Sequence, residues 1–443
     1  MTYDVAIIGG GVAGLSATVD LCARGKRVIL LEQKQRFGGR TYSFIDRTTG
    51  SVVDNGQHLL MGCYHATRTY LRTIGSDHLA VLQPTLEIPF FRPQHPPTVL
   101  RCLPLIAPLH LVSGLVRLSS LSPQDRLRLI RLGLDLLTTS PQKRQRLAKQ
   151  TAAEWLDSLG QSEEARKHLW DVIAIGSLND DPSIVSAALF RNVLRAAFLG
   201  KRENASLLIP RVGLSELLVD PALSFIGNHG GSVRAGATVK RLSISRDGIN
   251  GVVLDSEEQI RSSFVISAVP WHNAHRVVRG VVSSEWQNST IISINLWFDR
   301  EVMTDAFAAL LDCSIHWVFN RSSLLPSTGH AGERKHQHLS VVISGAASFA
   351  AMSTQQLVRL ALDDLRRVLP GVQRATLVHS LVMKEKRATF SPRPEAEPYR
   401  PTTATRFPNL FLAGDWTDTG FPATIEGAAL SGHRAAEAIL ALR

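Results

Sequence analysis

Cysteine is scarce in this chain of 443 residues. The four cysteines are Cys22, Cys63, Cys102 and Cys313. They lie far apart and form no Cys-x-x-Cys pair, so the sequence indicates neither a disulfide framework nor a zinc site. A reducing compartment fits this usage, and we expect no metal centre.

Long uninterrupted apolar runs are also absent. The most apolar stretch, 103–118, is interrupted by Pro104, Pro108 and His110, and it is too short for a membrane-spanning helix. Met1 is followed almost at once by the first strand pattern. We therefore expect no signal peptide or transit peptide.

Acidic residues are outnumbered, with 49 basic and 38 acidic side chains and a net charge of +11. Basic proteins favour polyanions or anionic membrane surfaces. The chain has no nucleic-acid motif and no interleaving of aromatic and basic residues. We therefore expect a membrane surface rather than nucleic acid as partner, with an ordinary basic soluble enzyme as the alternative.

The composition is that of a globular protein, with 44% apolar and 20% charged residues. A chain of this length is too long for one simple core. It predicts two domains, or one domain with a large insertion.

The N-terminus carries a glycine-rich turn between regular patterns. A strand pattern, a Gly-x-Gly-x-x-Gly turn, a helical pattern, a second strand pattern and an acid follow one another at residues 5–8, 9–14, 15–23, 27–31 and 32. This order is typical of a βαβ unit that binds a dinucleotide.

Each residue of this unit has a physical role. Gly9 permits the tight turn, Gly11 leaves room for a pyrophosphate, and Gly14 lets helix and strand pack closely. The helix start, with Val12 and Ala13, offers free N–H groups and a positive dipole end to phosphates. Glu32 can accept hydrogen bonds from a ribose diol.

Two further elements extend the expected cofactor site. Gly38, Gly39 and Arg40 follow the acid, and the chain ends on a strand pattern that runs into Gly414 and Asp415 before a helix start near Thr424. One long cofactor held at both chain ends explains this pattern. FAD is long enough, whereas a nicotinamide dinucleotide typically needs a single βαβ unit. No second Gly-x-Gly-x-x-Gly occurs, so the electron donor is not indicated.

A short cluster of hydrogen-bonding side chains follows a strand pattern at residues 52–54. Asn55, Gln57 and His58 surround Gly56. Such clusters often serve only to form a turn. The alternative is a catalytic role, because histidine is the usual acid–base residue.

The region 98–149 is rich in leucine and arginine. Residues 121–137 predict an amphipathic helix with Leu127, Ile130, Leu134 and Leu137 on one face. Arginines occupy other positions, at Arg126, Arg128 and Arg131. The apolar face could pack into the protein's own core, as in most soluble proteins, or lie on an anionic membrane.

Several motifs resemble a known superfamily. Residues 38–40, 265–270 and 412–415, with the N-terminal unit, are similar to the flavin-dependent amine oxidase and phytoene desaturase superfamily. Residues 54–58, 210–217, 385–390, 413–417 and 422–428 more closely resemble the hydroxysqualene dehydroxylase family. The resemblance covers nearly the whole chain.

This resemblance implies an FAD-dependent oxidoreductase of hopanoid and isoprenoid biosynthesis. Its reaction would be the reductive removal of the hydroxyl of hydroxysqualene to give squalene, with hydride from reduced flavin. The substrate would be a long apolar isoprenoid. The protein would be cytoplasmic and peripherally associated with the inner face of the membrane, through the 98–149 region.

The resemblance also implies roles for individual residues. The ADP and pyrophosphate part of FAD would lie against Gly9, Gly11, Gly14, Glu32, Gly39 and Arg40. Val239 would contact adenine through its backbone. The pyrophosphate and ribityl chain would lie at Gly414 and Asp415, and the pyrimidine end of the flavin at Thr424 and Ile425. His58 is the candidate proton donor, and Asn55 and Gln57 would shape the site.

The implied fold is α/β. It has a Rossmann-like FAD-binding domain of the glutathione-reductase type, an interleaved mixed α+β substrate domain, and a helical insertion that would face the membrane. The expected segments are FAD-binding parts at 1–85, 207–270 and 405–443, a helical substrate or membrane-facing region at 86–206, and a substrate domain at 271–404.

Three other functions stay open at this point. A phytoene or carotenoid desaturase would use the same cofactor but oxidise its isoprenoid. An amine oxidase would need an aromatic cage, and only five tyrosines occur, none beside Gly414 and Asp415. A non-catalytic FAD-binding protein is the third, and the 55–58 cluster argues against it.

Overall fold

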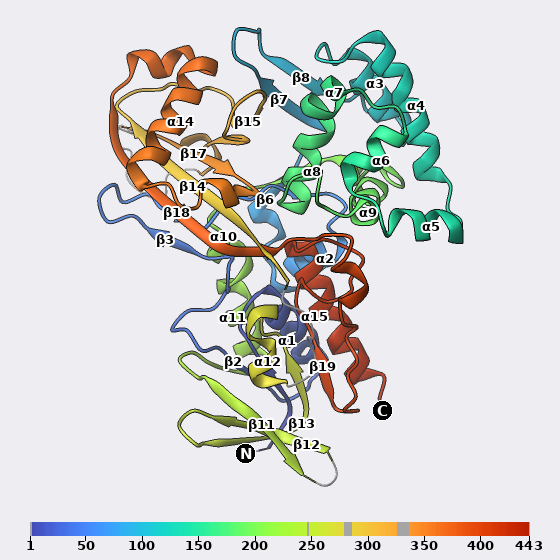
Figure 1. The fold of residues 1–443 in the computed structure, drawn as a ribbon. Coiled ribbons are helices and arrows are strands. Elements are labelled where there is room, and N and C mark those ends of the chain that lie inside the picture. The colour runs from blue at the N-terminus through green and yellow to red at the C-terminus, as the bar shows by residue number, and fades with distance from the viewer. Residues whose placement is uncertain (1, 246–247, 279–285, 326–335, 443) are drawn as a thin grey trace.

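The computed structural model describes residues 2–245, 248–278, 286–325 and 336–442. Figure 1 shows one lobe that carries both chain ends, and above it a second sheet beside a group of helices. The architecture is mixed α/β, as the sequence predicts.

The first sheet lies in the lobe that contains the chain ends. Its strands run in the order β10-β2-β1-β13-β12-β11. Strand β19 pairs with the edge of β13 that faces away from β1. The bounds are β1 (Thr2–Ile8), β2 (Val28–Leu31), β10 (Ser232–Arg234), β11 (Val239–Ser245), β12 (Gly248–Leu254), β13 (Gln259–Ser267) and β19 (Leu410–Leu412). Strands β10, β2, β1, β13 and β19 are parallel.

The parallel strands are apolar along almost their whole length, because both faces of the sheet are covered. Ile7 pairs with Leu30 on one side and Ile266 on the other, and all three are fully buried. Helices α1 (Val12–Ala23) and α15 (Ile425–Leu440) lie against each other on one face (Figure 1). They approach closely, since a Cβ added to Gly432 would lie 2.2 Å from the carbonyl oxygen of Ala13.

The second sheet is mostly antiparallel, in the order β18-β14-β17-β16-β15-β7-β8. The bounds are β7 (Glu87–Phe91), β8 (Thr98–Arg101), β14 (Asn288–Phe298), β15 (Phe307–Leu310), β16 (Trp317–Asn320), β17 (Gln337–Ile343) and β18 (Leu377–Phe390). One face of β14 enters an apolar core shared with α14 (Thr354–Val368). Its other face carries Ser293, Asn295 and Trp297, and Trp297 donates to the Ser51 hydroxyl at 3.0 Å.

Small sheets and short helices connect the two large sheets. The strands are β3 (Ser43–Ile45), β4 (Val52–Asp54), β5 (Leu60–Met61), β6 (Ala80–Leu82) and β9 (Leu207–Pro210). The helices are α2 (His65–Ile74), α10 (Leu214–Leu218), α11 (Asp220–Asn228), α12 (Trp271–Val277) and α13 (Arg321–Leu324). Short 3₁₀ segments occur at Asp77–Leu79, Arg202–Ala205, Ala346–Phe349, Pro370–Arg374 and Glu397–Tyr399.

A helical group fills the region between β8 and β9. Its helices are α3 (Leu109–Arg117), α4 (Pro123–Leu137), α5 (Pro141–Leu147), α6 (Ala152–Ser158), α7 (Glu163–Ala165), α8 (Asp171–Leu178) and α9 (Ala187–Phe198), with a π-helical turn at Arg166–Trp170. Trp155, Trp170 and Phe190 form the centre of its core. In the described part of the chain, no helix combines the length and the hydropathy needed to cross a membrane.

The apolar face predicted for helix α4 is exposed, which contradicts one of the two predictions made for it. The N-terminus of the helix is stabilised, because Ser122 caps it and Pro123 occupies the first turn. The residues that enter the core are Leu132 and Leu136. Leu127, Ile130, Leu134 and Leu137 are between 59 and 68% exposed, so the prediction that this face packs into the protein's own core is wrong.

Two histidines, His338 in β17 and His316 just before β16, predict loss of stability in acid. Burial lowers the pKa of His338 to about 3 and that of His316 to about 4. The unfolded chain takes up protons below about pH 6.5, whereas the folded chain does not. Each group therefore costs on the order of 1 kcal/mol per pH unit between about pH 6.5 and 4. The urea midpoint should fall over this range, and less steeply in His338→Gln; an equal slope would contradict the assignment.

Candidate flavin and substrate site

The three glycines of the N-terminal turn differ in what surrounds them. Gly9 has a φ of +106°, and an added Cβ would lie 2.8 Å from the carbonyl oxygen of Ala268. A Cβ on Gly14 would lie 1.9 Å from the Gly9 carbonyl oxygen. A Cβ on Gly11 would meet no atom within 4 Å. The protein's own packing therefore demands Gly9 and Gly14, while Gly11 borders open space.

The start of α1 faces this open space. Gly11 occupies the N-cap position and no side chain caps the helix, so the first N–H groups, those of Val12, Ala13 and Gly14, remain available to a ligand. Gly38 pairs with Gly11 as an isolated bridge, and Gly39 approaches so closely that its Cβ would lie 3.2 Å from Gly11 Cα. The arrangement fits an anion at this helix end.

Glu32 is buried at the end of β2, and its carboxylate organises the turn. Its two oxygens accept hydrogen bonds from the backbone N–H of Gly10, at 2.7 Å, and of Lys34, at 2.9 Å. A carboxylate has further lone pairs, so these bonds leave acceptors for a ribose diol. The backbone of Ala237 donates to the Glu32 carbonyl, which brings the start of β11, and with it Val239, beside Glu32.

Arg40 joins the two expected cofactor elements, which lie at opposite ends of the sequence. Its guanidinium is 2.6 Å from the Asp415 carboxylate, across 375 residues, and also donates to the Ala388 carbonyl. The group lies over the ring of Trp271, with 5.6 Å to the centroid. The structure thus brings Arg40 and Asp415 together as partners of each other, and their contacts with the cofactor stay predictions.

The C-terminal element is held by its own backbone contacts. Gly414 has a φ of +141°, and its N–H donates to the Ser431 hydroxyl at 2.8 Å. Thr424 caps α15, accepting from Gly427 N–H at 3.1 Å. The side chain of Ile425 is buried in the core, so only its backbone can serve a ligand at this helix end.

The turn after β4 contains the candidate catalytic residues. Asn55 donates its side-chain N–H to the Arg40 carbonyl at 3.1 Å, which ties the turn to the Arg40 loop. His58 Nδ1 lies 2.6 Å from the Gly56 carbonyl oxygen, so this nitrogen carries the proton. Burial lowers the pKa of His58, and Arg40 adds to this, while the Gly56 hydrogen bond and Asp54 oppose it.

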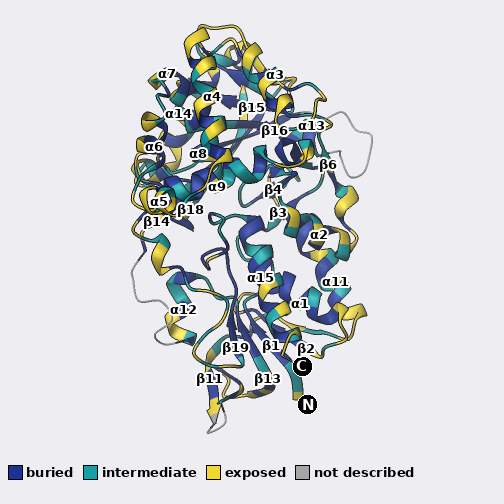
Figure 2. Cartoon of the chain, turned by 90° about the vertical axis from the view of Figure 1, so that its right-hand side faces the viewer, coloured by how far each residue is buried: buried dark blue, intermediate teal, exposed yellow. Residues whose placement is uncertain are grey.

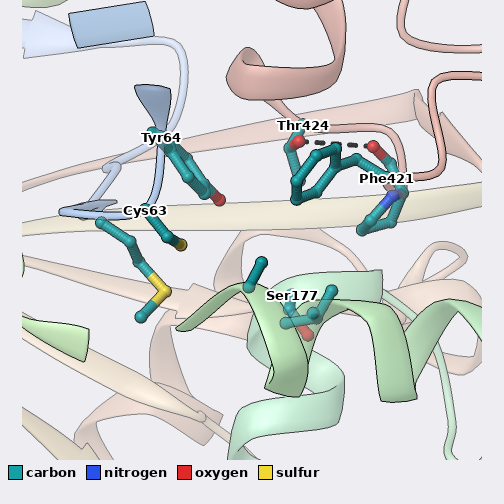
Figure 3. A pocket seen from close by; sticks show the side chains of 9 residues that line it. Cys63, Tyr64, Ser177, Phe421 and Thr424 are labelled. Carbon is teal, nitrogen blue, oxygen red and sulfur yellow. Dashed lines mark hydrogen bonds between the residues drawn. The ribbon is translucent and has the colours of Figure 1, made fainter. Parts of the chain in front are cut away.

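A small apolar pocket lies at the start of α15. Figure 3 shows Cys63 and Tyr64 on one side, Phe421 and Thr424 on another, and Ser177 of α8 below them. The remaining lining residues are Met61, Val193, Ala196 and Pro422. Burial raises the pKa of Tyr64, so its hydroxyl stays neutral and can donate.

Three buried charged residues support the site and were missed in the sequence. Arg321 pairs with Asp54 at 2.9 Å, Arg400 donates to backbone carbonyls of the 415–421 loop, and Glu426 accepts from the first N–H groups of α2. No spacing rule identifies such residues, because their partners are far away in the chain. Only Glu426 carries a local signal, because an acidic residue in the first turn of a helix is favoured by the helix dipole.

Comparison with protein-family models places the chain in a class. The model for flavin containing amine oxidoreductases matches residues 12–440, and the chain belongs to this family. The predicted superfamily and the prediction of FAD as cofactor are confirmed, and the protein is a flavin-dependent oxidoreductase.

Among curated relatives, the chain is similar to hydroxysqualene dehydroxylases. The protein of that name from Rhodopseudomonas palustris is 30% identical over 445 residues, covering 100% of this chain and 99% of the relative. That from Sinorhizobium fredii is also 30% identical, over 99% of both. The 15-cis-phytoene desaturase of Synechococcus elongatus is 25% identical, over 99% of this chain and 96% of the relative.

Solved structures share the fold at low identity. An oxidoreductase from Methanosarcina mazei superposes with a TM-score of 0.72 at 16% identity, over 99% of this chain and 100% of that one. Wild-type putrescine oxidase bound to putrescine gives a TM-score of 0.72 at 17% identity, over 100% and 99%. These likenesses define the fold alone.

Proposed function

We propose that this protein is a hydroxysqualene dehydroxylase, which removes the hydroxyl of hydroxysqualene reductively to give squalene in hopanoid or isoprenoid biosynthesis. The observation that carries the proposal is the full-length likeness, at 30% identity, to two proteins of that name. The apolar pocket beside the start of α15 has a lining that suits a hydrocarbon group.

We propose that the first sheet, with α1 and α15, forms a Rossmann-like FAD-binding domain of the glutathione-reductase type. The expected parts 1–85, 207–270 and 405–443 supply its strands. The second sheet would belong to the substrate domain, 271–404. Within 86–206, the β7–β8 hairpin adds to that sheet and the helices α3–α9 form the helical region.

The residues present fit FAD. The space at Gly11 and the uncapped N–H groups of α1 suit a pyrophosphate, and Glu32 suits the adenosine ribose. Val239 would contact adenine, and Thr424 and Ile425 the pyrimidine end. When bound and reduced, FAD supplies the hydride. Arg40 and Asp415 hold the two halves of the site together.

The proposed role of the 55–58 turn is to handle the leaving hydroxyl. Breaking the carbon–oxygen bond requires a proton on that oxygen, so that water leaves. His58 could give this proton from Nε2 only as the imidazolium, because Nδ1–H is committed to Gly56. Asn55 and Gln57 would shape the site. The surrounding apolar residues would exclude bulk water.

An anaerobic product assay tests the proposed reaction. Purified protein with reduced FAD is incubated with hydroxysqualene, and separately with oxidised FAD and phytoene, and products are identified by mass spectrometry. We expect squalene in the first incubation. Desaturated phytoene in the second would overturn the proposal in favour of the desaturase relatives. Turnover of putrescine would favour an amine oxidase, and no product with any substrate a non-catalytic flavoprotein.

We also propose that the protein associates peripherally with an anionic membrane surface. We expect this surface to be the cytoplasmic face of the membrane. Residues 98–149 hold nine basic and two acidic residues, a net +7 of the chain's +11. Of the seventeen large apolar side chains exposed in the described chain, nine lie between 105 and 137. The apolar stripe consists of Leu109, Val112 and Val116 of α3 with Leu127, Ile130, Leu134 and Leu137 of α4. Figure 2 shows exposed stretches in both helices, near the top of the view.

The apolar stripe and the positive charge act together, because stable docking takes two weak signals. Replacing Leu127, Ile130, Leu134 and Leu137 by serine should weaken binding to anionic vesicles by on the order of a hundredfold. Sedimentation with phosphatidylserine vesicles measures it. The matched control replaces Ile45, Val81, Val233 and Val378, which are exposed elsewhere. Equal binding of both variants would remove the proposal.

A further inference from the structure

We infer that Arg321 is a positioning residue that orients Gln57, so that the turn after β4 presents one hydrogen-bond donor and one acceptor to a single alcohol. The turn would thereby select a hydroxylated isoprenoid over the hydrocarbon. This inference rests on the proposed function and names how its substrate is recognised. It assigns Arg321, which lies on α13 beside the second sheet, to a site at the turn after β4, between the two large sheets.

The Arg321 guanidinium is fixed from two sides. The side chains of Arg321 and Asp54 are each 3% exposed and lie 2.9 Å apart. Asp54 also accepts from the Ser43 hydroxyl at 2.6 Å and from Leu214 N–H at 2.9 Å. The Asp54 carboxylate of this buried pair has three partners, Arg321, Ser43 and Leu214, so moving the guanidinium away would leave a buried charge without its counter-ion. The direction of the remaining guanidinium N–H groups is set by this pairing.

One of those N–H groups decides the orientation of Gln57. Arg321 Nη1 donates to the Gln57 side-chain oxygen. A guanidinium has donors only, so the amide cannot be reversed without placing its NH₂ against another N–H. Gln57 therefore directs its carbonyl oxygen to Arg321 and its NH₂ away from it. No described group accepts from this NH₂.

The next residue presents the opposite chemistry. His58 donates from Nδ1 to the Gly56 carbonyl, so the neutral ring has a lone pair at Nε2. No described group donates to that atom. Adjacent residues of one turn thus offer a donor and an acceptor. A hydroxyl group needs both, whereas an alkene carbon can use neither.

A third polar group borders the same turn. Ser293 of β14 is 1% exposed, and its hydroxyl has no partner among the described residues. This oxygen and the His58 ring carbon Cε1 each lie 3.6 Å from the position of a Cβ on Gly56. A buried hydroxyl without a partner is costly, so its presence here is a separate indication that a polar ligand atom reaches this turn.

Binding of the alcohol and the hydrocarbon to the oxidised holoenzyme tests the inference. Without reductant no turnover occurs, and flavin absorbance reports the Kd of hydroxysqualene and of squalene in detergent micelles. Gln57→Glu keeps an oxygen for Arg321 but replaces the donor by an acceptor. Arg321→Lys keeps a charge for Asp54 but lacks the planar fork. Arg191→Lys is the control, since Arg191 is also buried and ion-paired, on α9.

We expect the wild type to bind hydroxysqualene about tenfold or more tightly than squalene. Both test variants should lose this preference with an unchanged Kd for squalene, and Arg191→Lys should keep it. A purely structural role would weaken both ligands together and would overturn the inference, as would a wild type without preference. If Arg321→Lys does not fold, the two Kd values of Gln57→Glu decide the test. Failure of the wild type to form squalene counts against the proposed function itself.

Discussion

Gly11→Val is expected to give a folded protein that no longer retains FAD. Gly11 has φ −76° and ψ 178°, which is extended backbone that any residue adopts, and its Cβ would meet no protein atom within 4 Å. The added methyl groups would occupy the space in which we place the pyrophosphate. Loss of the close backbone approach should weaken FAD binding by about a thousandfold or more, since several charge-assisted hydrogen bonds are lost together.

Gly14→Ala is the matched comparison, three residues further along. Its Cβ would lie 1.9 Å from the Gly9 carbonyl oxygen, so this smaller substitution should destabilise the fold itself. Thermal melting of the apo forms and flavin content after purification separate the two effects. A Gly11→Val protein with normal flavin content would show that the cofactor lies elsewhere.

His58→Ala should lower the single-turnover rate of the prereduced enzyme by roughly 10² to 10⁴-fold, the usual contribution of a general acid. The pH profile gives the sign. Burial holds the pKa of His58 below its usual value of 6.5, so the imidazolium is the minor form at neutral pH. The rate should therefore rise as pH falls towards that lowered pKa, and fall about tenfold per unit above it.

His58→Gln is the control for this profile, because it retains a polar side chain without a proton that titrates. Its residual rate should lack the acidic rise. Rapid mixing of reduced enzyme with hydroxysqualene, followed by flavin absorbance and product analysis, measures both variants. A full rate in His58→Ala would exclude His58 as the proton donor, and Tyr64, whose neutral hydroxyl lines the apolar pocket, would be the next residue to test.

The parts of the fold that the sequence predicted are those governed by local rules. The strand before Gly9, the helix after it and helix α4 (Pro123–Leu137) follow from periodicity and glycine spacing. The prediction and the structure agree for these elements because the interactions that form them involve residues only a few positions apart. The FAD prediction succeeded for the same reason, since most of its elements are short motifs.

The parts that could not be predicted depend on partners far apart in the chain. The periodicity of α4 identified Leu127 and Leu134 as one face, but it does not say whether that face meets protein or solvent. The buried pair of Arg321 and Asp54 spans 267 positions, and nothing near either residue signals the other. The sequence predicts only that Arg40 and Asp415 contact the same cofactor. Their direct contact with each other was not predicted.

The bond between Arg40 and Asp415 also has a consequence for the timing of synthesis. The two residues are separated by 375 positions, and ribosomes add about 5–20 residues per second. Roughly 20 to 75 s therefore pass between the emergence of one partner and the other. During that interval α1 also lacks α15, its neighbour on the sheet. We therefore expect a site that needs both Arg40 and Asp415 to form only late in synthesis.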